Sequence, residues 1–133
     1  MRLIAFVLII GVSSLASAQP PGKFPPDSLI NTQVIPRTTP VIQVIGTMRN
    51  FAFGLGVRCQ FCHVGKEGMP LEQFDFVSDE IQQKKTARIM MRLTEDINKQ
   101  LDAAVPRQAA AEARVTCITC HRGKSTPDNT KPQ

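Results

Sequence analysis

Large aromatic side chains and histidines are scarce in this sequence. Its 133 residues contain no tryptophan, no tyrosine and only two histidines. There is no run of basic residues, which counts against a nucleic-acid-binding surface. Beyond the first ten residues there is no long hydrophobic run either, so no membrane-spanning helix is expected in the mature chain. A chain of this size with so few large side chains buries only a modest apolar core by itself.

The cysteines and histidines that are present form one pattern, which occurs twice. The copies are Cys59-Gln60-Phe61-Cys62-His63 and Cys117-Ile118-Thr119-Cys120-His121, and they use all four cysteines and both histidines. Cys-x-x-Cys-His is the attachment signal for c-type haem, in which the thiols add to the porphyrin vinyl groups and the imidazole becomes an axial iron ligand. The sequence therefore predicts two covalently bound haem c groups. Their apolar macrocycles would supply core that the chain lacks, so we expect the apoprotein to fold poorly.

Other uses of four cysteines explain less of the pattern. A disulfide framework gives no reason for a histidine directly after each pair. A single zinc site with four cysteine ligands also leaves both histidines unexplained. A thioredoxin-like redox motif would need a surrounding strand-helix-strand pattern, and neither pair is flanked by one. Haem attachment is thus the interpretation that accounts for every cysteine and histidine.

The first 18 residues carry the features of a secretory signal peptide. A basic Arg2 precedes the apolar residues 3–10, and the small residues 16–18 follow. The apolar run is shorter than the roughly 20 residues of a spanning helix. We expect cleavage after Ala18 and a periplasmic or otherwise exported mature chain.

Residues 19–40 hold most of the ten prolines of the chain and few apolar residues. This composition predicts an extended or irregular arm. The apolar positions Phe24, 29–30 and 34–35 could lie along the body of the protein and cover a haem edge. Alternatively, the arm could become ordered only on a partner.

Residues 41–123 are predicted to form a mainly α-helical, small multihaem cytochrome c domain with two helix-turn-motif units. Apolar residues recur at three- and four-residue steps from Val41 to Leu55, which predicts an amphipathic helix ending near Gly54 or Gly56. The first motif follows at once. Residues 64–78 are predicted to form a loop, with Phe74 and Phe76 as its anchors against haem.

A second, longer helix is predicted after Ser78 or Asp79, either of which could cap it. Pro106 ends this helix, and the alanine-rich residues 107–114 suit a short exposed helix before the second motif. Residues 124–133 are predicted to be a disordered tail. The inward face of the long helix is expected to be formed by Thr86, Met90, Leu93, Ile97 and Leu101.

Each iron needs a second axial ligand, and both histidines are already used. Methionine is the usual alternative, unless a histidine comes from another subunit. Met48 lies on the apolar face of the first helix, which the turn through Gly54 and Gly56 could fold back over the first haem. We therefore predict that Met48 binds the iron held by His63.

The second haem has two candidate ligands on the long helix. Met90 shares a face with Leu93, Ile97 and Leu101, whereas the neighbouring Met91 has mostly polar residues around it. We predict Met90 as the partner of His121. Met69 lies in the loop and is expected to pack or to stay exposed, because thioethers are common gap-fillers.

Several segments resemble the cytochrome c subunit of photosynthetic reaction centres. They are Ala87-Arg88-Ile89-Met90, residues 115–123 around the second motif, and Phe74-Asp75-Phe76-Val77-Ser78-Asp79. Met48, on a helix shortly before Cys59, adds to the likeness, which covers about residues 42–123. The resemblance implies units of a ligand-bearing helix, a turn and a short haem-binding helix. It also implies the same ligand pairs, Met48 with His63 and Met90 with His121. The family's subunit carries four haem motifs, and this chain carries two.

These features favour an electron carrier over an enzyme, because two filled axial positions leave no site for substrate. The formal net charge of +5 could steer the protein toward acidic redox partners, within a membrane-bound complex or outside one. Basic residues beside the motifs could serve this purpose or pair with haem propionates: Arg58, Lys66, Arg122 and Lys124. The alternatives are a small peroxidase or nitrogen-oxide reductase, or a gas sensor with a displaceable methionine. Assembly into oligomers is left open.

Overall fold

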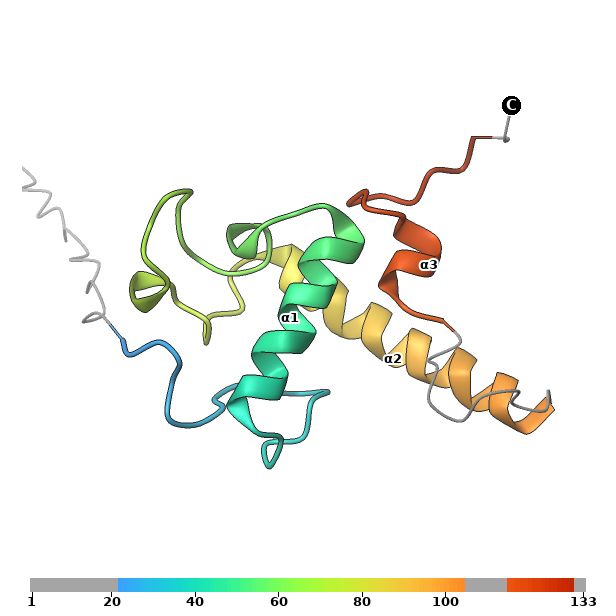
Figure 1. The fold of residues 1–133 in the computed structure, drawn as a ribbon, viewed down its shortest axis with the longest axis horizontal. Helices are drawn as coiled ribbons and strands as arrows, with labels where there is room; N and C mark the ends of the chain where they lie inside the picture. Colours follow the sequence, from blue (N-terminus) through green and yellow to red (C-terminus); the bar gives the residue numbers. More distant parts are fainter. Residues whose placement is uncertain (1–21, 105–114, 131–133) are drawn as a thin grey trace, which may run out of the picture.

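The computed structural model describes residues 22–104 and 115–130, and this part of the chain is mainly helical, as predicted. Within these ranges no β-strand forms, and Val64 and Asp75 make an isolated antiparallel bridge. The predicted signal peptide and the alanine-rich residues 107–114 lie outside the described residues. The elements in chain order, shown in Figure 1, are α1 (Val41–Leu55), the 3₁₀ turns Cys59–Phe61 and Leu71–Gln73, α2 (Gln82–Ala104) and α3 (Cys117–His121).

Local signals set both ends of α1. Pro40 stands at the N-cap with φ −55°, the value its ring favours. At the other end Gly56 adopts the left-handed conformation, with φ 64°. Its N–H donates to the Phe53 carbonyl (3.2 Å), and the Val57 N–H donates to the Ala52 carbonyl (3.0 Å). This pair of bonds is a Schellman cap, and it confirms the predicted helix end.

The long helix α2 begins at Gln82, so the prediction that Ser78 or Asp79 would cap it is wrong. The Asp79 carboxylate instead pairs with Lys84 (3.1 Å) and Arg88 (2.8 Å), on the first two turns of the helix. The Ser78 hydroxyl accepts the Glu80 N–H at 3.1 Å. The Asp79 carboxylate binds two positively charged side chains of α2, so it lies beside the helix. It does not cap the backbone N–H groups of the first turn.

Lys84 fastens the preceding loop to α2. Its side chain is buried, with 8% of the residue exposed. Its Nζ donates to the carbonyls of Phe76 (2.9 Å), Val77 (3.0 Å) and Ser78 (2.6 Å). A buried ammonium group needs such partners because it has lost its water. The loop that follows the first motif is therefore held against the start of α2.

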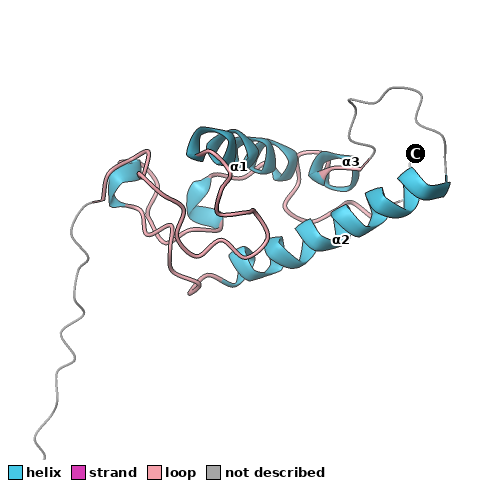
Figure 2. Cartoon of the chain, turned by 90° about the horizontal axis from the view of Figure 1, so that it is seen from below, coloured by secondary structure: helices cyan, strands magenta, loops and turns pink. Residues whose placement is uncertain are grey.

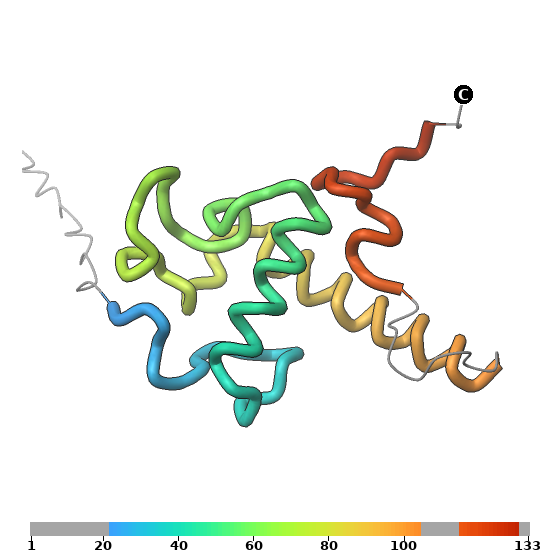
Figure 3. The backbone as a smooth tube through the Cα atoms, viewed as in Figure 1, coloured from blue at the N-terminus to red at the C-terminus, as the bar shows by residue number. Residues whose placement is uncertain are grey.

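The proline-rich arm, residues 22–40, is irregular and lies along the body of the protein. The Phe24 ring meets the Phe76 ring, with centroids 5.6 Å apart. Asn31 donates to the Val77 carbonyl (2.6 Å), and Arg88 donates to the Asn31 carbonyl (3.0 Å). Figure 3 shows the arm passing around the N-terminal end of α1. The arm was predicted either to lie along the body of the protein or to become ordered only on a partner. In the structure it lies along the body.

The short helix α3 packs against the C-terminal end of α1, and α2 runs past both (Figure 2). The Gly123 N–H donates to the Gly54 carbonyl at 2.9 Å. Asn98 of α2 joins the segment before α3, donating to the Val115 carbonyl (2.8 Å) and accepting the Val115 N–H (2.9 Å). The second motif is thereby fixed to both long helices.

The predicted inward face of α2 is open over part of its length. Met90 is 37% exposed, Leu93 is 49% exposed and Thr86 is exposed as well, whereas Ile97 and Leu101 are half-buried. The covered side of α2 carries Lys84 and Arg88, whose ion pairs with Asp79 join this helix to the segment before it. No apolar side chain is buried anywhere in residues 22–104 and 115–130. The chain therefore presents apolar surface along α2 that it does not itself cover.

Candidate functional site

The first motif folds into a tight turn that gathers its three functional side chains. The 3₁₀ turn Cys59–Phe61 is closed by the Cys62 N–H (3.2 Å) and the His63 N–H (3.0 Å), both donated to the Cys59 carbonyl. Residues three apart eclipse one another in a 3₁₀ turn, so Cys59 and Cys62 share one side of it. Two thiols on one side, with an imidazole directly after them, is the arrangement that thioether attachment of a haem requires.

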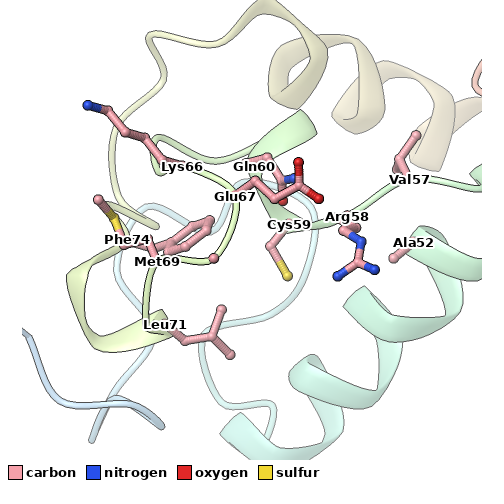
Figure 4. Close-up of a pocket in the computed structure, with 11 residues that line it drawn as sticks. Ala52, Val57, Arg58, Cys59, Gln60, Lys66, Glu67, Met69, Leu71 and Phe74 are labelled. Carbon is pink, nitrogen blue, oxygen red and sulfur yellow. The ribbon is translucent and has the colours of Figure 1, made fainter.

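Cys59 lines an open pocket of about 380 Å³ between the end of α1 and the loop 66–74 (Figure 4). Apolar walls and a charged rim surround the thiol, a composition typical of cofactor pockets. Cys62 is not among the lining residues, and neither is Met48. The apolar lining is Ala52, Val57, Met69, Leu71 and Phe74, and the charged lining is Arg58, Lys66 and Glu67.

His63 lies among aromatic rings beside this pocket. Its ring meets the edge of Phe76 at a centroid distance of 5.0 Å, and Phe76 stacks on Phe74 at 5.6 Å. Burial, together with the nearby charges of Lys84 and Arg88, lowers the pKa of His63 to about 4. The imidazole is therefore neutral at pH 7, which is the form that binds metals. The predicted anchors Phe74 and Phe76 thus gather at the predicted haem ligand.

The second motif is the helix α3 itself. Thr116 is its N-cap, and Thr116 and Thr119 form a reciprocal capping box. The His121 Nδ1 atom lies 2.9 Å from the Lys124 carbonyl oxygen. A carbonyl oxygen only accepts hydrogen bonds, so Nδ1 must carry the proton and Nε2 keeps its lone pair. This hydrogen bond favours one tautomer, as hydrogen bonds of this kind do in metal-binding histidines.

The four cysteines remain separate thiols. None is joined in a disulfide. Burial raises the pKa of the Cys62 and Cys117 thiols, which keeps them protonated and less prone to disulfide exchange. Among the described residues, no three His, Cys, Asp or Glu side chains gather as they would around zinc. A zinc site with four cysteine ligands or a disulfide framework would also give no role to the histidine that follows each cysteine pair.

The methionines in the described residues differ in how deeply they are buried and in what surrounds them. Met48 is half-buried on α1. Met90 lies on the open side of α2 with Ile89 and Leu93, whereas Met91 is half-buried. Met69, which was expected to pack or to stay exposed, shares the pocket with Cys59. The glycine at position 68 was the clue to this placement in the sequence. Glycine readily adopts the left-handed conformation, which Gly68 has here (φ 76°) and which turns the chain back just before Met69.

The fold and the motifs define the class of a small helical protein built around Cys-x-x-Cys-His sites, and comparisons agree with this class. Residues 69–132 match the family described as photosynthetic reaction centre cytochrome C subunit. The chain is 35% identical over 88 residues to cytochrome c-554 of Chloroflexus aurantiacus, covering 65% of this chain and 18% of that protein. It is 41% identical over 69 residues to the photosynthetic reaction center cytochrome c subunit of Roseobacter denitrificans, covering 52% and 17%.

These matches confirm the resemblance to the reaction-centre cytochrome family over much of the chain. The chain spans less than a fifth of the length of each of these relatives. No solved structure matches it. In the part of the chain that the structure describes, no helix has the length and apolar character needed to cross a bilayer.

Proposed function

We propose that this protein is an exported dihaem cytochrome c that passes single electrons between redox partners. One haem would be held by Cys59 and Cys62 and the other by Cys117 and Cys120. Haem iron supplies reversible one-electron chemistry, and the chain supplies the ligands, the burial and the spacing of the two groups. Similarity to two proteins named as cytochromes supports this class.

The observation that carries the proposal is the orientation of His121. Its Nδ1–H is donated to the Lys124 carbonyl at 2.9 Å, which leaves Nε2 as the only ring nitrogen able to bind a metal. The imidazole follows directly on Cys120, so the same helix would present the thiol and the ligand to one macrocycle. His63 meets the same chemical requirement because burial keeps it neutral.

The proposed second ligands are Met48 for the first iron and Met90 for the second. Met90 is supported by its place on the open apolar side of α2, beside Ile89 and Leu93. A flat macrocycle against this side would cover the surface that the protein leaves exposed. The assignment of Met48 is supported by its position on the apolar face of its helix. Met69 is the alternative ligand for the first iron, because it shares the pocket with Cys59.

The proposed partners are other redox proteins, in an exported compartment reached by cleavage of residues 1–18. One relative is named as a subunit of a photosynthetic reaction center, which supports docking on a membrane-bound complex. Lys124 pairs with Asp128 at 2.7 Å, whereas Arg58 and Lys66 lie at the rim of the Cys59 pocket. Those two side chains are the proposed contact with an acidic partner.

The haem count and the carrier role can be tested on protein purified from the periplasm of a host that matures c-type cytochromes. We expect the intact mass to equal that of the mature chain plus two haems. We also expect the reduced protein to bind carbon monoxide slowly or not at all, because both axial positions are filled. A mass with fewer than two haems would contradict the dihaem proposal. Prompt carbon monoxide binding would favour the haem enzyme or the gas sensor.

The methionine ligands can be tested with paired substitutions. Met48→Ala and Met90→Ala should each remove about half of the methionine-to-iron charge-transfer absorption of the oxidised protein, because each would free one iron. Met69→Ala and Met91→Ala are the matched controls and should leave this band at full strength. Loss of the band in Met69→Ala but not in Met48→Ala would assign the first iron to the loop methionine instead.

A further inference from the structure

The C-terminal end of α1 meets the second motif at a glycine. Gly54 is buried, and a Cβ atom added to it would lie 3.1 Å from the Ile118 nitrogen and 3.2 Å from the Cys117 Cβ. Both distances are shorter than ordinary van der Waals contacts. Helix α3 can therefore approach α1 this closely only because residue 54 has no side chain.

A second glycine contact lies one residue beyond the end of α1. A Cβ atom on Gly56 would lie only 2.0 Å from the Gly123 carbonyl oxygen. The Gly123 N–H also donates to the Gly54 carbonyl at 2.9 Å. The backbone that follows His121 is thus laid directly on the backbone that leads into Cys59. We call the contact of Gly54 and Gly56 with residues 117–123 the glycine seat.

The glycine seat joins the two attachment sites through very little chain. Gly56 is separated from Cys59 by two residues, and Gly123 is separated from His121 by one. Cys117 is itself one of the residues beside Gly54 in the seat. A haem bound through thioethers moves with its cysteines, so the position of each motif turn determines the position of its haem. The seat therefore joins the segments that carry the two motifs by direct backbone contact.

We propose that the glycine seat sets the separation of the two haems and so positions them for electron exchange with each other. This inference rests on the proposed dihaem function. In the exchange, one electron leaves a ferrous iron and reduces the ferric iron of the other haem, with no further reactant. Electron tunnelling weakens steeply with distance, so a spacing fixed by backbone contact makes the exchange rate a built-in property of the chain. Gly54 and Gly56 are positioning residues in this role.

The chain offers a matched control for Gly54. Gly46 lies on the same helix, and a Cβ atom there meets nothing within 4 Å. Gly46→Ala and Gly54→Ala both replace a helical glycine by alanine, and only the change at 54 pushes against the second motif. Gly56→Ala also places alanine in a left-handed position, so its result is compared with that of Gly54→Ala.

The test is the magnetic dipolar interaction between the two ferric haems in the purified holoprotein, measured by pulsed electron paramagnetic resonance. This interaction reports the distance between the irons, which general loss of stability does not change. Gly54→Ala and Gly56→Ala should shift or broaden the dipolar spectrum, or lose the haem at Cys117 and Cys120 while keeping the other. Gly46→Ala should match the wild-type spectrum. An unchanged spectrum in both seat variants, with both haems attached, would overturn the proposal.

The wild-type protein provides a test that does not depend on the variants. A rigid seat predicts one narrow iron–iron distance, and a broad distribution would contradict it even if neither seat variant accumulates. The intact mass, measured on the same samples, separates the two levels of inference. A wild-type mass with one haem refutes the dihaem function. Two haems with a broad distance distribution refute the glycine seat alone.

Discussion

At the scale of single residues, a histidine can bind a metal only through a nitrogen that carries no proton, and the two motif histidines meet this condition differently. His121 is oriented by a hydrogen bond from Nδ1 to the Lys124 carbonyl, in a partly exposed turn. His63 is kept neutral by burial and by the charges of Lys84 and Arg88.

Asp79 offers a prediction about acid stability. Its hydrogen bonds to Arg88, Asn31 and Lys84 hold the pKa of its carboxyl well below the usual value of about 3.9. A carboxyl whose folded pKa is depressed stabilises the fold above its unfolded pKa, and this stabilisation is lost as the pH falls toward the folded pKa. Asp79→Asn should therefore lower the free energy of unfolding at neutral pH, and the difference from wild type should shrink below about pH 4.

Denaturant unfolding of the holoprotein and of Asp79→Asn, followed by circular dichroism from pH 7 to about pH 2, measures this difference. Asparagine keeps the size of the side chain and one oxygen that accepts hydrogen bonds, so the comparison isolates the charge. His63 does not interfere, because it is present in both proteins. A stability difference that stays constant across the whole pH range would show that the carboxylate charge of Asp79 is not what fastens the arm and the loop to α2.

At the scale of elements, the Asn98 side chain joins α2 to the segment before the second motif. Asn98 both donates to and accepts from the backbone of Val115, at 2.8 and 2.9 Å. Asn98→Asp keeps the acceptor but removes the donor and places a negative charge against the carbonyl oxygen. The expected loss is roughly 1–3 kcal/mol in the free energy of unfolding, measured by denaturant titration of the holoprotein.

Asn50→Asp is the control for this change, because Asn50 is an exposed asparagine on α1. It should alter the free energy of unfolding by no more than about 0.5 kcal/mol, as surface substitutions usually do. Equal losses in the two variants would mean that the added charge, rather than the Val115 contact, is responsible. In that case α3 would be held in place mainly by its contact with α1.

The sequence predicted α1 well and α2 only in part, and the difference lies in the range of the interactions. Pro40 and Gly56 act on the backbone beside them, so the bounds of α1 could be inferred from local rules. The start of α2 depends on Asp79 meeting Arg88 and on Lys84 meeting three loop carbonyls, contacts that no short window of sequence reveals. The roles of the motif residues stay predictions, and they rest on the spacing that the chemistry of haem attachment requires.

The ligand methionines were less predictable, because helical phase says which face a residue occupies and not what covers that face. The helical periodicity placed Met90 on the same face of α2 as Leu93, and both side chains are exposed in the structure. Phase could not find Met69, which enters the Cys59 pocket through a loop turn at Gly68. Both assignments to haem therefore stay predictions, and the paired methionine substitutions test them.

At the scale of the whole molecule, the described part of the protein has apolar side chains that are at most half-buried, so apolar burial contributes less folding free energy than usual. Burial of apolar side chains is the dominant favourable term in most small domains. Here no apolar side chain is buried in the described ranges, and the large exposed ones include Phe53 (74%), Ile89 (61%) and Ile118 (43%). Exposed apolar side chains on all three helices are what a chain would present to cofactors that complete its core.

The folding of the chain should therefore depend on attached haem. The variant that tests this replaces every attachment cysteine: Cys59→Ala, Cys62→Ala, Cys117→Ala and Cys120→Ala. We expect it to lose most of its far-ultraviolet helical signal and to unfold without a cooperative transition, whereas the holoprotein should show one sharp transition. Two half variants, each lacking one cysteine pair, divide the effect between the haems. If each haem completes the part of the core beside its own motif, each half variant should keep an intermediate helical signal. A fourfold variant with the helical signal and the sharp melting of the holoprotein would show that the arm, Lys84 and the glycine seat suffice to hold the fold without haem.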